Sequence, residues 1–311
     1  MKAKTSRDER GTIRDWIEFL LVWPLMQALA WFPEPAARRI AATIGVGLRW
    51  AVPGWRRVAR TNLDIAFPEL SEERKRELLV GCYRNIGRVL FALARLPRLN
   101  RENISRWIVY DGYEHFERAS ARGRGVLFLT AHLGSWELSS AAHALYGHPM
   151  RVMVRRLDNP LLDRFVDRRR TLFGNRSIVK EDAARRVLEA LRRNEAVGIL
   201  ADQNTAGDDG VFVPFFGQPA ASTEGVARFA ARTGATIIPG FAVWNETRGR
   251  CVLKFYPPLE PAASGDRAED VRETTRRCQA AIERAIREYP DQWLWIHRRW
   301  KRRPAGAAPI Y

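Results

Sequence analysis

The fold of this 311-residue chain is decided by the stretch Thr130-Ala131-His132-Leu133-Gly134-Ser135-Trp136-Glu137. The run 126–130 that leads into it is apolar up to its last residue, follows Gly123 and Gly125, and predicts a buried strand. Residues 137–146 are rich in Leu and Ala and predict a helix. A strand, a short loop and a helix in this order are typical of α/β proteins, which carry functional side chains on the loops after their strands.

His132 and Glu137 form the candidate catalytic pair of this loop. On one continuous helix, at ~100° per residue, two side chains five positions apart would diverge by roughly 140°. If His132 precedes the helix, however, one ring nitrogen can turn back and donate to the Glu137 carboxylate. The other nitrogen is then a free base that can take a proton from a hydroxyl. The alternative is a helix-start histidine beside a solvated first-turn carboxylate, and for an isolated pair this alternative is the more frequent one.

The rest of the chain alternates between strand-like and helical segments. Strands are predicted at 126–130, 151–154, 197–201, 236–243 and 251–256, and helices at 36–52, 72–96, 159–173, 181–193, 223–233 and 271–288. The uncharged apolar segment 211–223 predicts either a buried loop or the wall of a hydrocarbon-binding groove. This alternation predicts the α/β class, with a single domain built on a mixed or largely parallel sheet flanked by helices.

The N-terminal region is expected to associate with a membrane. Residues 16–33 are mostly apolar but contain Glu18 and Pro24, and they are short for a bilayer span, which needs ~20 predominantly apolar residues. Five of the eleven tryptophans lie in the first 55 residues, and indole rings favour the lipid headgroup region. We therefore expect residues 1–55 to be membrane-associating helices, spanning or interfacial, and residues 56–311 to be the catalytic domain. A pair of ordinary core helices is the alternative.

The composition restricts the partners. The net charge of +17 suits phosphate-rich or carboxylate-rich partners: an anionic membrane, an acidic protein or a nucleic acid. The arginines are not interleaved with aromatic residues in an RNA-binding signature, so no nucleic acid is expected. The three cysteines are far apart and in no metal-ligand spacing, which predicts a reducing compartment without a zinc site or a disulfide framework.

Polar side chains follow two further predicted strands. Arg155 and Asp202 each stand just after one of them. If these strands are parallel neighbours of 126–130, both side chains meet His132 and Glu137 at one edge of the sheet, where α/β folds bind their ligands. For each arginine taken singly, a solvated surface position is the more frequent outcome.

Four segments of the chain, in order, resemble the lipid A late acyltransferases, the lauroyl and myristoyl transferases of the wider lysophospholipid acyltransferase group. The segments are RTNLDIAFP at 60–68, AHLGSWE at 131–137, FVPFFG at 212–217 and YPDQWLWIHRRWKRRP at 289–304. The last is the most specific, and the resemblance covers nearly the whole chain. It implies a single domain of the lysophospholipid acyltransferase type and an enzyme without a cofactor.

The resemblance further implies acyl transfer from an acyl carrier protein thioester to a hydroxyl of a lipid A precursor, at the cytoplasmic face of the bacterial inner membrane. His132 would be the general base and Glu137 would orient it. Arg170 and, less closely matched, Arg155 would hold an oxyanion or a phosphate, and Asp202 would lie near the site.

Two points stay open within the resemblance. This chain has Gln203 and Arg156 where the family often has other residues, so the roles of positions beside Asp202 and Arg155 are not transferred. The alternative enzyme is a relative that uses acyl-CoA and acylates another glycolipid, such as a mannosylated phosphoinositide, or a lysophospholipid. The donor, carrier protein or CoA, distinguishes the two.

Overall fold

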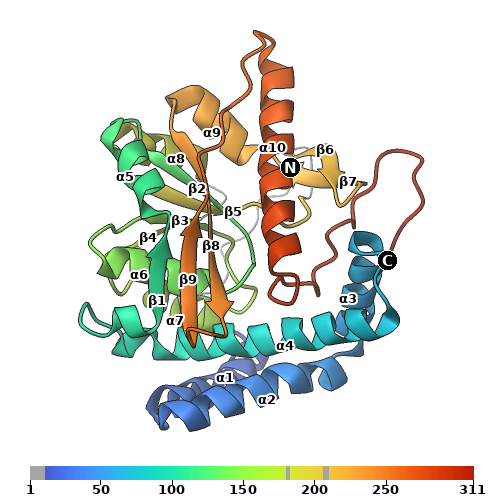
Figure 1. Cartoon of the computed structure of the whole chain (residues 1–311). Coiled ribbons are helices and arrows are strands. Elements are labelled where there is room, and N and C mark those ends of the chain that lie inside the picture. The colour runs from blue at the N-terminus through green and yellow to red at the C-terminus, as the bar shows by residue number, and fades with distance from the viewer. Residues whose placement is uncertain (1–10, 180–182, 206–209) are drawn as a thin grey trace.

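The computed structural model describes residues 11–179, 183–205 and 210–311, and shows a twisted sheet with helices on both faces (Figure 1). The strands are β1 (Ile108–Asp111), β2 (Val126–Thr130), β3 (Arg151–Val154), β4 (Arg176–Val179), β5 (Ala196–Leu200), β6 (Gly210–Phe215), β7 (Gln218–Thr223), β8 (Thr236–Asn245) and β9 (Arg250–Phe255). The α-helices are α1 (Ile13–Trp31), α2 (Glu34–Ala51), α3 (Pro53–Ala66), α4 (Glu72–Arg95), α5 (Tyr113–Ala121), α6 (Trp136–Leu145), α7 (Pro160–Arg170), α8 (Ala183–Arg192), α9 (Gly225–Thr233) and α10 (Arg267–Glu288). The predicted α/β class is confirmed.

The sheet has the order β1-β9-β8-β2-β5-β3-β4 within these residues, and β6 pairs only with β7. All neighbours in the sheet run parallel except β8 and β9, which are antiparallel. The predicted strand 126–130 is the central strand β2. Leu127 and Leu129 pack against α8, α9 and α10, whereas Phe128 packs against α5 and α6. A strand covered on both faces is apolar throughout, which is why its sequence shows no alternation.

Several elements were not predicted. The strands β1 and β4 have four residues each and lie at the two edges of the sheet. The segment 211–223, predicted as a loop or a groove wall, forms the β6–β7 hairpin, whose Phe215 is fully buried. The predicted helix 181–193 corresponds to α8, and its residues 181 and 182 lie outside the described residues.

The helices α1 and α2 lie along α4 as a separate layer (Figure 1). α2 approaches α4 closely because glycines face each other: a Cβ on Gly45 would lie 2.3 Å from the Tyr83 carbonyl oxygen, and one on Gly87 would lie 2.2 Å from the Ala41 carbonyl oxygen. The predicted helix 36–52 is α2, which ends at Ala51, and Pro53 is the first residue of α3.

The outer side of α1 is apolar although it faces solvent. Ile13 is 82% exposed, Leu20 59% and Leu21 72%, and the side chains of Ile17 and Trp31 are exposed as well. In the described part of the chain, no helix combines the length and the apolar character that a membrane crossing requires.

Buried histidines are expected to make the fold acid-sensitive. His143 is 1% exposed and its Nδ1 lies 2.7 Å from the Tyr110 hydroxyl oxygen. Burial, helped by the charge of His148, lowers the pKa of His143 from 6.5 to about 3. Because the unfolded chain then binds a proton that the native state does not, the free energy of unfolding should fall as pH drops from about 6.5 towards 3. The slope is about 1.4 kcal/mol per pH unit for each such histidine.

Urea unfolding of wild type and His143→Gln at a series of pH values measures this contribution. The variant should show a weaker pH dependence below pH 6.5, whatever its stability at neutral pH. If the free energy of unfolding depended on pH in the same way in both proteins, His143 would not be neutral in the native state.

Candidate active site

The loop between β2 and α6 places His132 at the carboxyl edge of the central strand. Gly134 has a φ of +65°, and a Cβ there would lie 2.0 Å from the carbonyl oxygen of Ala242 on β8. The Gly134 N–H donates to the Gln292 carbonyl at 3.1 Å, and the Ser135 N–H donates to the Ala242 carbonyl at 2.7 Å. These hydrogen bonds hold the loop between β8 and the C-terminal segment 289–304. The backbone of Gly134 lies so close to β8 that only glycine fits there.

Asp202 holds the imidazole of His132. Nδ1 of His132 lies 2.9 Å from Oδ1 of Asp202, and the His132 backbone N–H donates to Oδ2 at 3.0 Å. The indole Nε1 of Trp293 also donates to Oδ2, at 2.8 Å. An ionised carboxylate only accepts, so Nδ1 carries the proton and Nε2 is left with a lone pair. This arrangement fixes both the orientation and the tautomer of a base.

Asp202 is ionised in this environment. Burial alone would raise the pKa of Asp202, but the charge of His132 and the hydrogen bonds from His132 and Trp293 outweigh it and hold the pKa at about 2, below the ordinary 3.8. The carboxylate therefore stays negative at neutral pH. A carboxylate in this position can stabilise an imidazolium if Nε2 takes a proton.

Nε2 of His132 is open to a substrate. The side chain of His132 is 22% exposed. The amide nitrogen of Gln203 lies 3.5 Å from Nε2, which is longer than an ordinary hydrogen bond, and the Trp136 ring meets the imidazole edge to face with centroids 5.0 Å apart. A hydroxyl that replaces the Gln203 amide can therefore donate to Nε2.

Glu137 binds Arg170 and not His132. Nε of Arg170 lies 2.9 Å from Oε2 of Glu137, and Nη2 lies 2.5 Å from Oε1. Both side chains are largely buried. The predicted hydrogen bond from His132 to Glu137 is not made within the described ranges, because the parallel pairing of β2 with β5 brings Asp202 beside the imidazole while Glu137 points from α6 towards α7. Asp202, 70 residues away, takes the orienting position.

Arg155 lies apart from these pairs. Its side chain is 79% exposed and its Nη2 is 3.6 Å from Oδ1 of Asp158. The strand order does put the end of β3 on the same edge of the sheet as His132, but the guanidinium points into solvent. The structure thus groups four of the five predicted side chains into two hydrogen-bonded pairs, His132 with Asp202 and Glu137 with Arg170, and leaves Arg155 outside them.

A narrow cavity begins beside the loop between β2 and α6 and runs between the sheet and α6. It extends from Thr130 and Trp136 to His143 and Met150, and the space between its atoms is about 470 Å³ when the open solvent at its mouth is included. Its floor includes Gly198, where a Cβ would lie 2.7 Å from Cε of Met150. The side chains around it are mainly apolar, so the cavity suits a hydrocarbon chain.

The C-terminal segment is the support that the sequence did not reveal. Besides Trp293, it supplies the Leu294 N–H, which donates to the His132 carbonyl at 3.0 Å. Asn62 on α3 donates to the carbonyls of Trp295 at 2.6 Å and His297 at 2.7 Å. The segments 60–68, 131–137 and 289–304 are therefore in direct contact, although only the spacing within each is visible in the sequence.

The three cysteines are not nucleophiles. Each is buried and free, and burial raises the pKa of each thiol to about 12, so the reactive thiolate is absent at neutral pH. In residues 11–179, 183–205 and 210–311, no three His, Cys, Asp or Glu side chains are grouped as metal ligands.

Trp293→Phe is expected to lower kcat about tenfold by removing one of the hydrogen bonds that fix Asp202, since a bond to a charged group contributes about 1.5–3 kcal/mol. Trp295→Phe is the matched control, because its Nε1 donates to the Pro290 carbonyl and not to the site. Both variants should unfold at a lower temperature, but only Trp293→Phe should lower kcat. Equal kcat values in the two variants would show that Trp293 is merely structural.

Comparison with known proteins assigns the chain. The family described as bacterial lipid A biosynthesis acyltransferase matches residues 4–302. The chain is 28% identical over 298 residues to the lipid A biosynthesis lauroyltransferase of Escherichia coli K12, covering 95% of this chain and 94% of the relative. It is 26% identical over 297 residues to the lipid A biosynthesis palmitoleoyltransferase of the same organism, with the same coverage. A lipid A biosynthesis acyltransferase of Haemophilus influenzae is 24% identical over 270 residues, covering 86% and 82%. The chain therefore belongs to the bacterial lipid A biosynthesis acyltransferase family and is an acyltransferase.

Proposed function

We propose that this enzyme transfers a fatty acyl chain from the thioester of an acyl carrier protein to a hydroxyl of a lipid A precursor. The observation that carries the proposal is the Asp202-oriented His132, whose imidazole contacts Trp136, a residue that lines a narrow and mainly apolar cavity. A base beside a hydrocarbon site is what transfer of an acyl chain to a hydroxyl requires. The relatives named lauroyltransferase and palmitoleoyltransferase support the same chemistry.

The proposed reaction is direct. The acceptor hydroxyl donates to Nε2 of His132 and attacks the thioester carbonyl as its proton moves to that nitrogen. The new carbon–oxygen bond gives a tetrahedral oxyanion, which collapses as the carbon–sulfur bond breaks. The proton on Nε2 then passes to the departing thiolate. No acyl-enzyme forms, and Ser135 lies in no G-x-S-x-G elbow that would make it a nucleophile.

We propose that Arg170 stabilises negative charge in this reaction and that Glu137 positions it. Burial would lower the pKa of Arg170, but the hydrogen bonds and the charge of Glu137 outweigh this and raise it, so the guanidinium stays charged. The contacts with Glu137 use Nε and Nη2. Nη1 then remains for an oxyanion or a substrate phosphate, which is a charge-assisted contact.

The donor decides between this proposal and its nearest alternative. A net charge of +17 favours docking of an acidic carrier protein by charge complementarity. The alternative enzyme uses acyl-CoA and another glycolipid or a lysophospholipid. The purified full chain is to be given either acyl thioester together with a lipid A precursor, and the products weighed by mass spectrometry. Acylated precursor from the carrier-protein thioester alone supports the proposal, and transfer from acyl-CoA alone contradicts it.

We further propose that residues 1–55 dock on the cytoplasmic face of the inner membrane, with 56–311 as the catalytic domain. The apolar outer side of α1 supports this, since an exposed apolar stripe on a soluble surface marks an interaction site. Exposed tryptophans at 16, 23, 31, 50 and 55 fit the headgroup region. α1 would then lie in the interface with its axis along the membrane.

The double substitution Leu20→Gln and Leu21→Gln is expected to weaken membrane binding at least tenfold. Burying one leucine side chain in lipid contributes about 1.5–3 kcal/mol to the binding free energy, and the substitution removes this contribution twice. The measurement is the bound fraction in vesicle sedimentation. Leu157→Gln with Leu172→Gln is the matched control, since both side chains are exposed elsewhere. Equal binding of the two double variants would refute docking through α1.

A further inference from the structure

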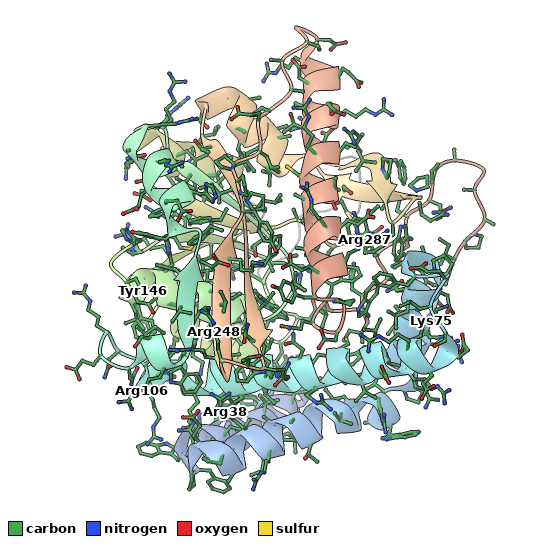
Figure 2. All side chains as sticks on the ribbon, in the orientation of Figure 1. Arg38, Lys75, Arg106, Tyr146, Arg248 and Arg287 are labelled. Carbon is green, nitrogen blue, oxygen red and sulfur yellow. The ribbon has the colours of Figure 1, made fainter. Side chains whose placement is uncertain are left out.

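An arginine-lined recess opens where the turn between α1 and α2 meets the end of α4. It contains about 740 Å³ of open space, and Arg95, Arg98 and Arg106 line it together with Glu34 and Trp107. Figure 2 shows Arg106 at the same end of the molecule as Arg38 on α2. The recess lies apart from the catalytic cavity, whose lining residues are different.

Positive charge is in excess in this recess. The carboxylate of Glu34 already binds Arg38, with Nε 2.8 Å from Oε1. Among the residues that the structure describes, no carboxylate lies within ion-pair distance of Arg98 or Arg106. The recess therefore contains three arginines and a single carboxylate, that of Glu34, which already binds Arg38. Such an arrangement is stabilised by an anion.

Arg95 shows that the site is built into the fold. It is 6% exposed, and its Nη2 donates to the Phe32 carbonyl while its Nε is buried without a partner. Burial lowers the pKa of Arg95, and the charges of Arg98 and Arg38 lower it further, against the opposing effect of Glu34. A largely buried guanidinium at the wall of a positively charged recess can bind a phosphate through charge-assisted hydrogen bonds.

The surroundings point to a lipid as the source of the phosphate. The guanidinium of Arg98 lies 4.4 Å from the ring centroid of Trp31. Trp31 is 69% exposed and Phe32 46%, and both continue the apolar outer side of α1. An indole beside an arginine at the edge of an apolar surface is typical of the headgroup level of a membrane.

The recess is also distant from the reaction. Asn85 on α4 donates to the Gly134 carbonyl in the catalytic loop at 3.0 Å. Arg95 follows ten positions later on the same helix, which corresponds to roughly 15 Å along its axis. An anion bound at Arg95 therefore does not take part in acyl transfer at His132.

We propose that Arg95, Arg98 and Arg106 bind the phosphate of an anionic phospholipid headgroup in the membrane on which α1 docks. The bound headgroup fixes the position of the α1–α2 turn at the membrane surface. This inference rests on the proposed membrane docking and is independent of the proposed acyl donor and acceptor.

The test compares binding of the full chain to phosphatidylcholine vesicles with and without phosphatidylglycerol. Arg98→Gln with Arg106→Gln leaves the buried Arg95 intact and should weaken binding to the phosphatidylglycerol vesicles about tenfold or more, with little change on phosphatidylcholine. Arg118→Gln on α5 with Arg122→Gln just after it removes the same charge at a distance. Arg39→Gln with Arg57→Gln removes it on the N-terminal helices outside the recess. Both controls should bind nearly as wild type does.

Each outcome has one meaning. An equal loss in the Arg39 and Arg57 double variant would show diffuse attraction and overturn the site. Unchanged vesicle binding of the Arg98 and Arg106 double variant would also overturn the phosphate site. If the wild type bound no vesicle at all, the proposed docking of α1 would be overturned instead. Acyl transfer with detergent-dispersed substrates should be unchanged. If the Arg98 and Arg106 double variant had a raised KM for the glycolipid in this detergent assay, the recess would bind the phosphate of the acceptor. That result would contradict binding of a phospholipid headgroup.

Discussion

Replacing His132 with Gln is expected to lower kcat by about a thousandfold or more while KM stays within a few-fold of wild type. A positioned general base contributes roughly 10²–10⁴ to the rate, and removing it also removes the acid that protonates the leaving thiolate. The Gln side chain can still donate to Asp202, so the loop should keep its place. Steady-state acyl transfer measures the effect.

A thermal unfolding curve close to wild type is the control for the fold of His132→Gln. With the fold intact, near-normal kcat would exclude His132 as the base. A fall in binding alone, with kcat preserved, would place His132 in substrate recognition and would equally contradict the proposed reaction.

Asp202→Asn is expected to have the second largest effect, a loss of about 10³–10⁴ in kcat. The Asn amide can present its NH₂ group to Nδ1 of His132, which moves the imidazole proton to Nε2 and leaves no lone pair for the hydroxyl. The magnitude follows the same substitution in the Asp–His pair of serine proteases. Glu137→Gln is the informative comparison, since the structure assigns Glu137 to Arg170 and not to the imidazole. Rates should be measured as for His132→Gln.

Asp202→Asn also carries a stability signature. The pKa of Asp202 is about 2 in the fold and 3.8 ordinarily. A carboxyl with a lowered pKa contributes stability that is complete above about pH 4 and is lost as pH falls towards 2. The variant lacks this carboxyl, so its stability relative to wild type should improve as the solution is acidified through that range. A constant difference between the two unfolding curves would contradict the low pKa.

Local patterns in the sequence predicted local structure well. The apolar run 126–130 is β2, and the loop after it carries His132 at the sheet edge as predicted. The helix 72–96 is α4, with Ser71 accepting a hydrogen bond from the Arg74 N–H as its cap. These signals are strong because each lies within one element, where spacing alone determines which side chains are buried.

The pairing within the site could not be predicted in the same way. Glu137 was the carboxylate nearest to His132 in the sequence, whereas the structure gives the imidazole to Asp202. That contact depends on β5 lying beside β2, with Thr130 opposite Leu200, and strand order is not contained in the spacing of one loop. The contact between Trp293 and Asp202 could not be predicted for the same reason, because it joins the C-terminal segment 289–304 to the end of the central strand β5.

The most direct test is transfer of a labelled acyl chain from an acyl carrier protein thioester to a lipid A precursor, with wild type, His132→Gln and Asp202→Asn side by side. Mass spectrometry of the glycolipid should show the addition of one acyl chain with wild type and almost no acylated product with either variant. The three proteins are compared at the same concentration and after thermal unfolding has shown that each is folded. Acylated glycolipid in comparable amounts from all three proteins would contradict an Asp202-oriented His132 as the base of the reaction.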